Sequence, residues 1–311
     1  MTEPTPNPLV SVVIPVHDGE RYLAECLSSV QSQSYRPIET IVVDDGSSDS
    51  SVEIASHAPG VRLIRQANRD VSAARNAGVR AAGGVFIAFL DYDDLWLPEK
   101  IEKQVAWFGL HPQDELVFTD IVKFDDAGHV RHARDRHRWA RRLSGPRAFP
   151  SLARKNPVLP SAVLVRRESL IRAGLFNEAF RTCGDYEMWL RMAGLGMRFG
   201  YLPLPLTRYR VHAGNTGRRI EVMHEDRLRA VRVAFADSRI PPRLRRFERL
   251  ALASAHLEGA HSFFGAGRPD LFLEQVRTAV RLWPWSLDWK TIRRCPRAFL
   301  SVHPKPPLTR P

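Results

Sequence analysis

The sequence predicts an α/β fold in which helices flank a mostly parallel, doubly wound sheet. In the first hundred residues, short apolar runs rich in valine and isoleucine alternate with segments of helical periodicity. This alternation is typical of parallel sheets whose strands are joined by helices. Polar residues gather directly after three of the apolar runs. Such sheets bind ligands beyond the carboxyl ends of their strands, so the same region predicts a binding site.

The individual elements of this first part follow from periodicity. Residues 9–16 form a continuous apolar run, which is typical of a buried strand. The segment after it carries Leu23, Leu27 and Val30 at helical spacing, which predicts an amphipathic helix over residues 20–33. The pattern then repeats, with predicted strands over residues 38–43, 61–64 and 85–90 and an alanine-rich helix over residues 71–82.

The second part of the chain alternates less regularly. Its predicted elements are strands over 114–124 and 129–130 joined by a tight turn, a strand over 161–165 and a helix over 167–173. The stretch "CGDYEMWLRMAG" then places Asp185 just before an amphipathic helix. Aspartate is a common N-cap residue, so Asp185 has a structural interpretation as well as a chemical one.

Beyond residue 216 the periodicity predicts only helices. They cover residues 221–236, 243–264 and 269–283, and "GAGR" at 265–268 separates the last two into a helical hairpin. The hairpin faintly resembles one tetratricopeptide unit. Because a single such unit cannot bury its own apolar face, we expect it to dock on the rest of the chain or on a partner.

Composition indicates an ordinary globular protein of 311 residues, 44% hydrophobic and 26% charged. No apolar stretch approaches the ~18 residues of a membrane span. The first residues lack the basic and apolar segments of a secretory signal. Three isolated cysteines, Cys26, Cys183 and Cys295, argue against a disulfide framework and for a reducing compartment. We therefore expect a cytoplasmic protein.

The net charge of +12 is unevenly distributed. Residues 216–311 hold 19 Lys and Arg against 9 Asp and Glu, and residues 131–147 hold seven arginines against one acid. Three tryptophans, Trp283, Trp285 and Trp289, accompany the basic residues of the tail. This asymmetry suggests an anionic partner, such as a lipid surface, a phosphorylated substrate or nucleic acid. The alternative is a solvated basic face, with the tryptophans packed inward.

The stretch "AFLDYDD" ends a predicted strand in three carboxylates, Asp91, Asp93 and Asp94. Like charges this close repel one another, and each is costly to desolvate. A divalent cation with oxygen ligands would neutralise the cluster. The alternative is a strand that surfaces into a solvated acidic turn.

The chain contains neither a G-x-G-x-x-G turn after its first strand nor a G-x-x-x-x-G-K-[ST] loop. A nucleotide would then be bound in another way. The carboxylate of Asp45 can accept hydrogen bonds from a uracil N–H or from ribose hydroxyls, and a metal ion at Asp91 and Asp93 can bridge a diphosphate. Arg75 offers a planar fork for a phosphate or carboxylate, although an isolated helical arginine more often faces solvent.

Four separated motifs agree in order and spacing: "PVHD" at 15–18, "VDDGS" at 43–47, "ARNAG" at 74–78 and "DYDD" at 91–94. Together they resemble the family 2 glycosyltransferases of the GT-A fold, over roughly residues 9–215. The resemblance implies a catalytic domain over 1–215, with a nucleotide-sugar-binding half at about 9–110 and an acceptor half at about 111–215. Residues 216–311 would form a basic α-helical extension.

In this family a sugar moves, with inversion, from a nucleotide diphosphate donor, usually a UDP- or dTDP-sugar, to an acceptor hydroxyl. The resemblance implies that the nucleotide-sugar is bound by Pro15, Val16, His17, Asp44, Asp45, Gly46, Ser47, Arg75, Asn76, Asp91, Tyr92, Asp93 and His212, and that Mg²⁺ or Mn²⁺ is held by Asp91, Asp93, Asp94 and His212.

The same resemblance assigns the general base to Asp185, because the family usually has Glu-Asp at the start of this helix. Here Gly184 replaces the glutamate, which puts a secondary role in acceptor positioning in doubt. "RYRVHAGN" at 208–215 resembles the closing segment of the family, in which the histidine contacts the diphosphate or the metal. His212 otherwise has the interpretation of a surface histidine at a strand end.

The expected acceptor is a glycan or a lipid-linked sugar in cell-surface polysaccharide synthesis, and the basic tail would hold the enzyme peripherally on the inner face of the plasma membrane. Two other classes are weighed against this function. A nucleic-acid-binding protein would explain the basic charge, but the acidic strand ends oppose a phosphate backbone, so no nucleic acid is expected. A metal-dependent nucleotidyltransferase of similar fold would carry a glycine-rich basic loop where this chain has "PVHD".

Overall fold

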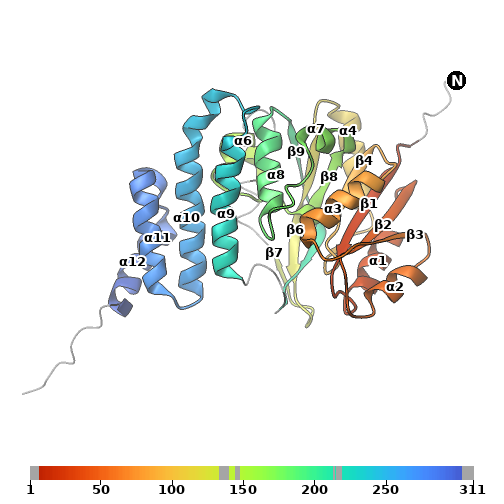
Figure 1. Ribbon diagram of the computed structural model, residues 1–311, viewed down its shortest axis with the longest axis horizontal. Helices are drawn as coiled ribbons and strands as arrows, with labels where there is room; N and C mark the ends of the chain where they lie inside the picture. The colour runs from red at the N-terminus through yellow and green to blue at the C-terminus, as the bar shows by residue number, and fades with distance from the viewer. Residues whose placement is uncertain (1–6, 133–139, 144–147, 213, 215–218, 303–311) are drawn as a thin grey trace, which may run out of the picture.

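The computed structural model describes residues 7–132, 140–143, 148–212, 214 and 219–302. Within these ranges, one large sheet with helices on both faces occupies one part of the molecule, and long helices line up beside it (Figure 1). The predicted α/β fold with a helical C-terminal region is confirmed. Most of the arginine-rich stretch at 131–147 lies outside the described residues.

The first four strands are parallel and follow the order β3-β2-β1-β4, as the alternating pattern predicts. Connecting helices form between them, although α2 is too short to give a clear periodic signal. The elements are β1 Val10–Val16, α1 Leu23–Gln31, β2 Ile38–Asp44, α2 Ser51–His57, β3 Val61–Arg65, α3 Asp70–Ala81 and β4 Phe86–Phe89.

The second part of the sheet is mixed. Strand β8 is antiparallel to both β4 and β6, whereas β9 runs parallel to β6. The predicted turn at 125–128 does join two antiparallel strands. The elements are β5 Leu95–Trp96, α4 Lys100–Leu110, β6 Leu116–Phe124, β7 Val130–His132, η1 Arg141–Leu143, α6 Ala148–Leu152, η3 Pro160–Ala162, β8 Val163–Arg166, α7 Arg167–Ala173, α8 Gly184–Gly194 and β9 Phe199–Arg210.

Strand β9 could not be predicted from its sequence, because "LPLPL" interrupts it with two prolines and prolines argue against a central strand. The structure accommodates them in a bulge. Thr119 pairs with Leu202 and Ile121 pairs with Thr207, so the residues between Leu202 and Thr207 leave the ladder. Both prolines are exposed there. The strand then resumes and carries the chain to the site.

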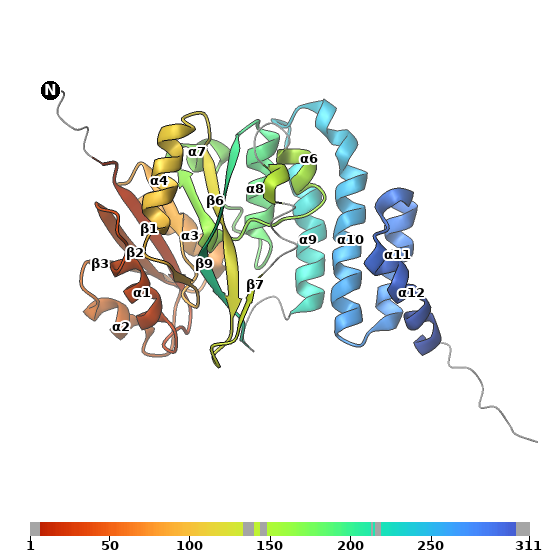
Figure 2. The ribbon, with the colours of Figure 1, turned by 180° about the vertical axis from the view of Figure 1, so that it is seen from behind.

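Alternating residues of the strands point to opposite faces of the sheet and contribute to two hydrophobic cores, one on each face. Val13 packs with Ala74 of α3 and with α8, whereas Ile14 packs with Leu27 of α1 and Ile101 of α4. Figures 1 and 2, which view the molecule from opposite sides, show α3 and α8 in front of the sheet in one view and α1 and α4 in front of it in the other. Strands β1, β2 and β4 are therefore covered on both faces, whereas no residue of the edge strand β3 is fully buried.

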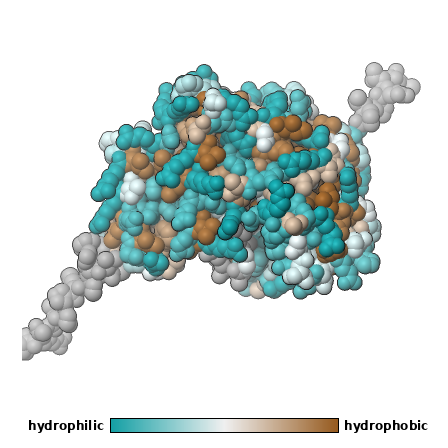
Figure 3. Space-filling view, in the orientation of Figure 1, coloured by the Kyte–Doolittle hydropathy of each residue, from teal (hydrophilic) through white to brown (hydrophobic). Residues whose placement is uncertain are grey.

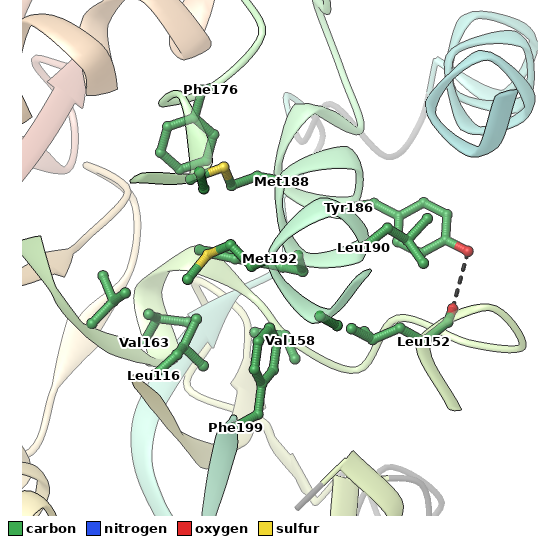
Figure 4. Packing of buried hydrophobic residues seen from close by; sticks show 14 of the residues in the cluster. Leu116, Leu152, Val158, Val163, Phe176, Tyr186, Met188, Leu190, Met192 and Phe199 are labelled. Carbon is green, nitrogen blue, oxygen red and sulfur yellow. Dashed lines mark hydrogen bonds between the residues drawn. The ribbon is translucent and has the colours of Figure 1, made fainter. Parts of the chain in front are cut away.

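Helix α8 is anchored deeply in one of these cores. Met188 lies beside Phe176 and Met192 extends toward Val163 and Leu116 of the sheet, while Tyr186 donates a hydrogen bond from its hydroxyl to the carbonyl of Leu152 at 3.0 Å (Figure 4). Because the helix is buried on several sides, its first turn is held at a fixed place against the sheet.

The C-terminal helices extend the molecule in one direction. Helix α9 packs against α8, α10 against α9, and α11 against α10, so the predicted hairpin does dock on the rest of the chain. The elements are α9 Ile220–Ala236, η5 Pro242–Phe247, α10 Glu248–Gly265, α11 Pro269–Leu282, η6 Pro284–Ser286 and α12 Trp289–Val302. No helix in the described ranges is long and apolar enough to cross a membrane.

Candidate active site

The predicted polar residues of three strands meet at one edge of the sheet, beyond the carboxyl ends of β1, β2 and β4. The loops after β1 and β2 are tied together there by hydrogen bonds. The amide of Asp18 donates to the Ser47 hydroxyl at 3.0 Å, and the amide of Ser48 donates to the Asp18 carboxylate at 2.8 Å. The chain turns at Gly46, where φ is +78°, and a Cβ at this position would lie 3.0 Å from the backbone nitrogen of Asn68. Ser47 and Gly46 therefore fix the conformation of the loops at this edge of the sheet.

Asp45 is surrounded by donors that the sequence did not single out. Its Oδ1 accepts hydrogen bonds from the Gln66 side chain at 2.7 Å and from the Arg69 amide at 2.9 Å. The Nδ1 atom of His17 lies 3.1 Å from the backbone carbonyl oxygen of Asp45, and its Nε2 atom lies 3.2 Å from the side-chain Nδ2 of Asn68. Gln66, Asn68 and Arg69 follow directly after β3, and this position at a strand end is the signal that could have identified them.

Three other predicted nucleotide contacts lie deeper in the protein. Pro15 and Val16 are buried, and the Val16 carbonyl accepts a hydrogen bond from the Asp45 amide. The Asp44 carboxylate is also buried, accepts from the Ser47 amide at 3.1 Å and lies 3.7 Å from Arg65. These residues support the edge from below rather than presenting side chains to a ligand.

Asp91 is paired with Arg75. The Nη2 atom of Arg75 lies 2.7 Å from the Asp91 Oδ1, and Arg75 is only 5% exposed. Its guanidinium also lies over the ring of Phe176, 5.7 Å from the centroid. The solvent-facing alternative for Arg75 is therefore wrong, because the arginine is buried beside an acid.

Asp93 meets the chain's closing segment. The Nε2 atom of His212 lies 2.9 Å from the Asp93 Oδ2, and both side chains are mostly buried. Burial and the nearby Asp91 raise the pKa of Asp93, while the contact with His212 opposes that shift. Tyr92, between the two acids, packs against Gly19 instead, where a Cβ would lie 2.7 Å from its ring. Burial and the two flanking acids raise the pKa of Tyr92 to about 12.

Asp94 takes a different place from the one predicted. It is fully buried, its Oδ1 accepts a hydrogen bond from the Arg210 amide at 2.9 Å, and burial raises its pKa well above the usual value. The Arg210 side chain donates to the Asp93 carbonyl at 2.9 Å and lies between the rings of Tyr22 and Phe124. Arg210 and Asp94 together fix the end of β9 to the acidic turn, a role that the sequence did not reveal.

Asp185 reaches the same edge from α8. Its pKa is raised mainly by burial, with Arg75 lowering it and Asp91 raising it further, so both groups lie within electrostatic range. Asn156 is 3.5 Å from its Oδ2. The N-cap position of α8 belongs to Cys183, not to Asp185. The structure thus brings together Asp91, Arg75 and Asp185, which are far apart in the sequence.

Close packing explains why position 184, directly before Asp185, is a glycine. A Cβ at position 184 would lie 2.6 Å from the Ser72 hydroxyl oxygen and 3.4 Å from the Phe180 Cβ. Ser72 is completely buried in α3. A glutamate would not fit here without a shift of the Ser72 side chain or of the helix, so glycine at this position suits the close packing of α3 against α8.

The side-chain amide of Asn76 forms hydrogen bonds inside the protein, away from the edge of the sheet where Asp45 and Asp91 lie. Its Nδ2 donates to the Phe176 carbonyl at 2.8 Å and to Glu178 at 2.9 Å, while its Oδ1 accepts from the Phe176 amide at 2.9 Å. The nucleotide contact at Asn76 stays a prediction from the family resemblance, and in this structure these hydrogen bonds occupy the side chain. Asn76 instead holds the 176–178 loop, and Phe176 with it, against α3.

The four predicted metal ligands are not arranged around one point. Within the described ranges, no three or more His, Cys, Asp or Glu side chains could together hold one ion. Asp91 is engaged by Arg75, and Asp94 is turned into the interior. The pair that fits is Asp93 and His212, whose ligand atoms are 2.9 Å apart. Adjacent ligands of an octahedral ion at about 2.1 Å are separated by about 3.0 Å, and Mg²⁺ commonly binds one or two carboxylates together with substrate phosphates.

A family model described as glycosyl transferase family 2 matches residues 11–174, more than half of the chain. The chain belongs to this family. An uncharacterised glycosyltransferase of Rickettsia typhi is 30% identical over 197 residues, which cover 61% of this chain and 60% of that protein. The O-antigen biosynthesis protein RfbC of Myxococcus xanthus is 30% identical over 207 residues, 64% of this chain and 16% of RfbC. The chain thus spans less than two thirds of these two relatives.

The fold is also shared with a solved glycosyltransferase structure. The mannosyltransferase PcManGT of Pyrobaculum calidifontis, in complex with GDP-Man and Mn²⁺, matches with a TM-score of 0.66 and 19% identity, over 96% of this chain and 82% of that protein. At this identity the likeness establishes the fold of the family 2 chain as GT-A and leaves the donor and the metal to be argued from its own residues.

Proposed function

We propose that this family 2 protein is an inverting, metal-dependent glycosyltransferase that moves a sugar from a UDP- or dTDP-sugar to a hydroxyl of a glycan or lipid-linked acceptor. The observation that carries the proposal is the meeting of Asp185, Arg75 and Asp91 at the ligand edge of the sheet. A carboxylate with a raised pKa, an adjacent buried cation and an acidic turn are the three groups that such a transfer needs.

The donor would lie across the ends of β1, β2 and β4. The exposed His17 ring and the Asp45 carboxylate, already fixed by Gln66 and the Arg69 amide, would bind the base and ribose. A Mg²⁺ or Mn²⁺ ion held by Asp93 and His212 would supply positive charge for the diphosphate. Arg75 contributes a second positive charge beside the leaving diphosphate, and it needs no rearrangement because Asp91 already orients it.

Asp185 is the proposed general base. An acceptor hydroxyl is a poor nucleophile, so a carboxylate within hydrogen-bond reach must take its proton as the new bond to the anomeric carbon forms. Burial raises the pKa of Asp185, which makes the carboxylate a stronger base, while the Arg75 guanidinium opposes this shift by favouring the ionised form. A single displacement with one base inverts the anomeric centre and requires no covalent sugar–enzyme intermediate.

The proposed biological setting is cell-surface polysaccharide synthesis, with the enzyme at the cytoplasmic side of the plasma membrane. The support is the similarity to an O-antigen biosynthesis protein and the basic C-terminal region, which suits an acceptor carried on an anionic lipid. The donor class and the acceptor class named above belong to this proposal.

One experiment separates this function from a nucleotidyltransferase of similar fold. The protein is incubated with UDP-glucose, UDP-GlcNAc, GDP-mannose and dTDP-rhamnose, each with Mn²⁺ or with EDTA. Thermal shifts identify the donor, since a ligand that binds only the folded protein raises its apparent stability. We expect metal-dependent release of a nucleoside diphosphate with the preferred donor. Formation of a nucleoside triphosphate and a sugar 1-phosphate when pyrophosphate is added, or no stabilisation by any nucleotide-sugar, would reject the proposal.

A further inference from the structure

The far end of the helical region exposes a compact group of apolar side chains. Trp285 is 89% exposed, Trp289 71%, Ile292 48% and Leu287 39%. Among the described residues, twelve large hydrophobic side chains are exposed, and these four lie within eight consecutive positions. Scattered single apolar residues are normal on a protein surface, whereas a local group of this kind is typical of an interaction site.

Helical geometry explains why two of these apolar side chains, Trp289 and Ile292, face outward together. Trp289, Ile292 and Arg293 are spaced three and four residues apart on α12 and so share one face. Thr291 and Ala298 are buried on the opposite face, and Ala298 packs into the core formed with α10 and α11. Trp283 packs against that core as well, so the inward-packing alternative holds for this tryptophan and fails for the other two.

The charge around this group is positive. Residues 281–297 contain five basic residues and one acid, Asp288. Asp288 is exposed, but it accepts hydrogen bonds from Thr291 and lies 3.5 Å from His261, so its charge is partly engaged by its neighbours. Lys290 and Arg293 are exposed beside the tryptophans. Figures 1 and 2 agree that α12 lies at the end of the molecule opposite β3.

We propose that this surface, made by Trp285, Leu287, Trp289, Lys290, Ile292 and Arg293, docks on the interface of an anionic phospholipid membrane. Tryptophan rings suit the boundary between headgroups and acyl chains, and lysine and arginine beside them bind anionic headgroups. The face drawn in Figure 3 is otherwise mostly hydrophilic, with apolar residues scattered in small groups. The inference rests on the membrane setting of the proposed function, for which it names the docking surface, and it does not depend on the sugar-transfer chemistry.

The test uses the full chain and vesicles, without any nucleotide-sugar. Sedimentation is measured with phosphatidylcholine vesicles and with vesicles containing about one quarter phosphatidylglycerol, at low and high salt. We expect binding to the anionic vesicles that weakens as salt rises. Each basic residue near such a surface contributes about 1 kcal/mol, or about fivefold in affinity. The K290E/R293E variant should therefore bind at least about tenfold more weakly.

The apolar contribution is tested with a second variant, W285S/W289S, which should also lose most vesicle binding. Both tryptophans are exposed, so these changes should leave the melting temperature close to that of the wild type. The control is Leu110→Ser on α4, which removes an equally exposed apolar side chain, 79% exposed, elsewhere on the molecule. The control should bind vesicles normally.

Three results would overturn the inference. The first is equal recovery with neutral and anionic vesicles, and the second is unchanged binding in both variants. The third is an absence of binding to any vesicle; if W285S/W289S then abolishes a dimer seen in sedimentation equilibrium, the surface receives a second copy of the chain instead. None of these results would bear on donor hydrolysis, so this inference and the proposed function can fail separately.

Discussion

The imidazole of His212 lies 2.9 Å from the carboxylate of Asp93, a residue 119 positions earlier in the chain. The contact joins the end of β9 to the acidic turn after β4, and the backbone on both sides is fixed by Arg210. Burial and the nearby Asp91 raise the pKa of Asp93, whereas the contact with His212 opposes that shift, so His212 favours the ionised carboxylate.

The first prediction is that Asp93→Ala weakens Mn²⁺-dependent donor binding by about tenfold or more, because one of the two proposed metal ligands is lost. His212→Ala should have an effect of the same kind. Binding is measured by calorimetry with the preferred nucleotide-sugar, with and without Mn²⁺. Asp270→Ala removes an exposed carboxylate on α11 and is the matched control. Unchanged affinity and unchanged metal dependence in Asp93→Ala would disprove the metal assignment.

The second prediction concerns the general base. Asp185→Asn should preserve donor affinity but lower transfer by roughly two to four orders of magnitude, which is the usual contribution of a general base. The measurement is a comparison of kcat for sugar transfer with the Kd for the donor. Near-normal turnover would return Asp185 to a structural role in the first turn of α8.

The pH dependence of transfer provides a third, independent prediction. A base must be deprotonated to act, and burial raises the pKa of Asp185 above the ordinary value of 3.8. The wild-type kcat should therefore fall at a pH above 3.8 as the medium is acidified. In Asp185→Asn the residual activity should lose this acid limb. A limb that persists in the variant would mean that another group, such as Asp93, is responsible.

The fourth prediction tests the packing of Gly184. Gly184→Ala should destabilise the protein by about 1–3 kcal/mol, the usual cost of overpacking, because the added Cβ would lie 2.6 Å from the Ser72 hydroxyl oxygen. The Ser72→Ala/Gly184→Ala double variant should recover most of that stability, since the Ser72 Cβ is 3.9 Å from the new Cβ. Chemical denaturation of the four proteins of the cycle measures the coupling. Additive effects would contradict the steric explanation.

The fifth prediction concerns the helices. His224 of α9 and His256 of α10 both lie within hydrogen-bond distance of the Gln275 Oε1 of α11, at 2.9 and 2.7 Å. Burial lowers the pKa of both histidines, and the nearby arginines Arg227 and Arg232 lower it further. At acidic pH the unfolded chain therefore binds more protons than the folded protein.

Stability should consequently be full above pH 6.5, the ordinary pKa of histidine, and should decrease as the pH falls below it. The measurement is the free energy of unfolding between neutral pH and about pH 5. His256→Gln keeps a donor for Gln275 without the titrating ring and should flatten part of this decrease, whereas the control His57→Gln, on the surface of α2, should not. An unaltered pH profile in His256→Gln would show that this residue does not contribute.

Much of the first half of the fold follows from sequence alone. Continuous apolar runs and helical spacing are local properties, and they identify four parallel strands and the helices α1 and α3. The same local reasoning places acidic residues at the strand ends, because a polar residue directly after a buried strand must emerge at the edge of the sheet. Short elements such as α2 and β5 carry too few residues for a periodic signal.

What the sequence could not determine is which of these side chains meet. Asp93 and Asp94 are neighbours of the same type, yet one faces His212 and the other is buried beneath Arg210. Arg75 is held beside Asp91 and within range of Asp185 because α3 and α8 pack on the same face of the sheet. Strand β9 forms although two prolines interrupt it, since a bulge removes them from the ladder. Composition and periodicity thus determined most helices and strands of the first half, and the edge of the sheet at which the acidic residues lie. Strand register and packing between distant segments decided which side chain each of these residues contacts and the charges that surround it.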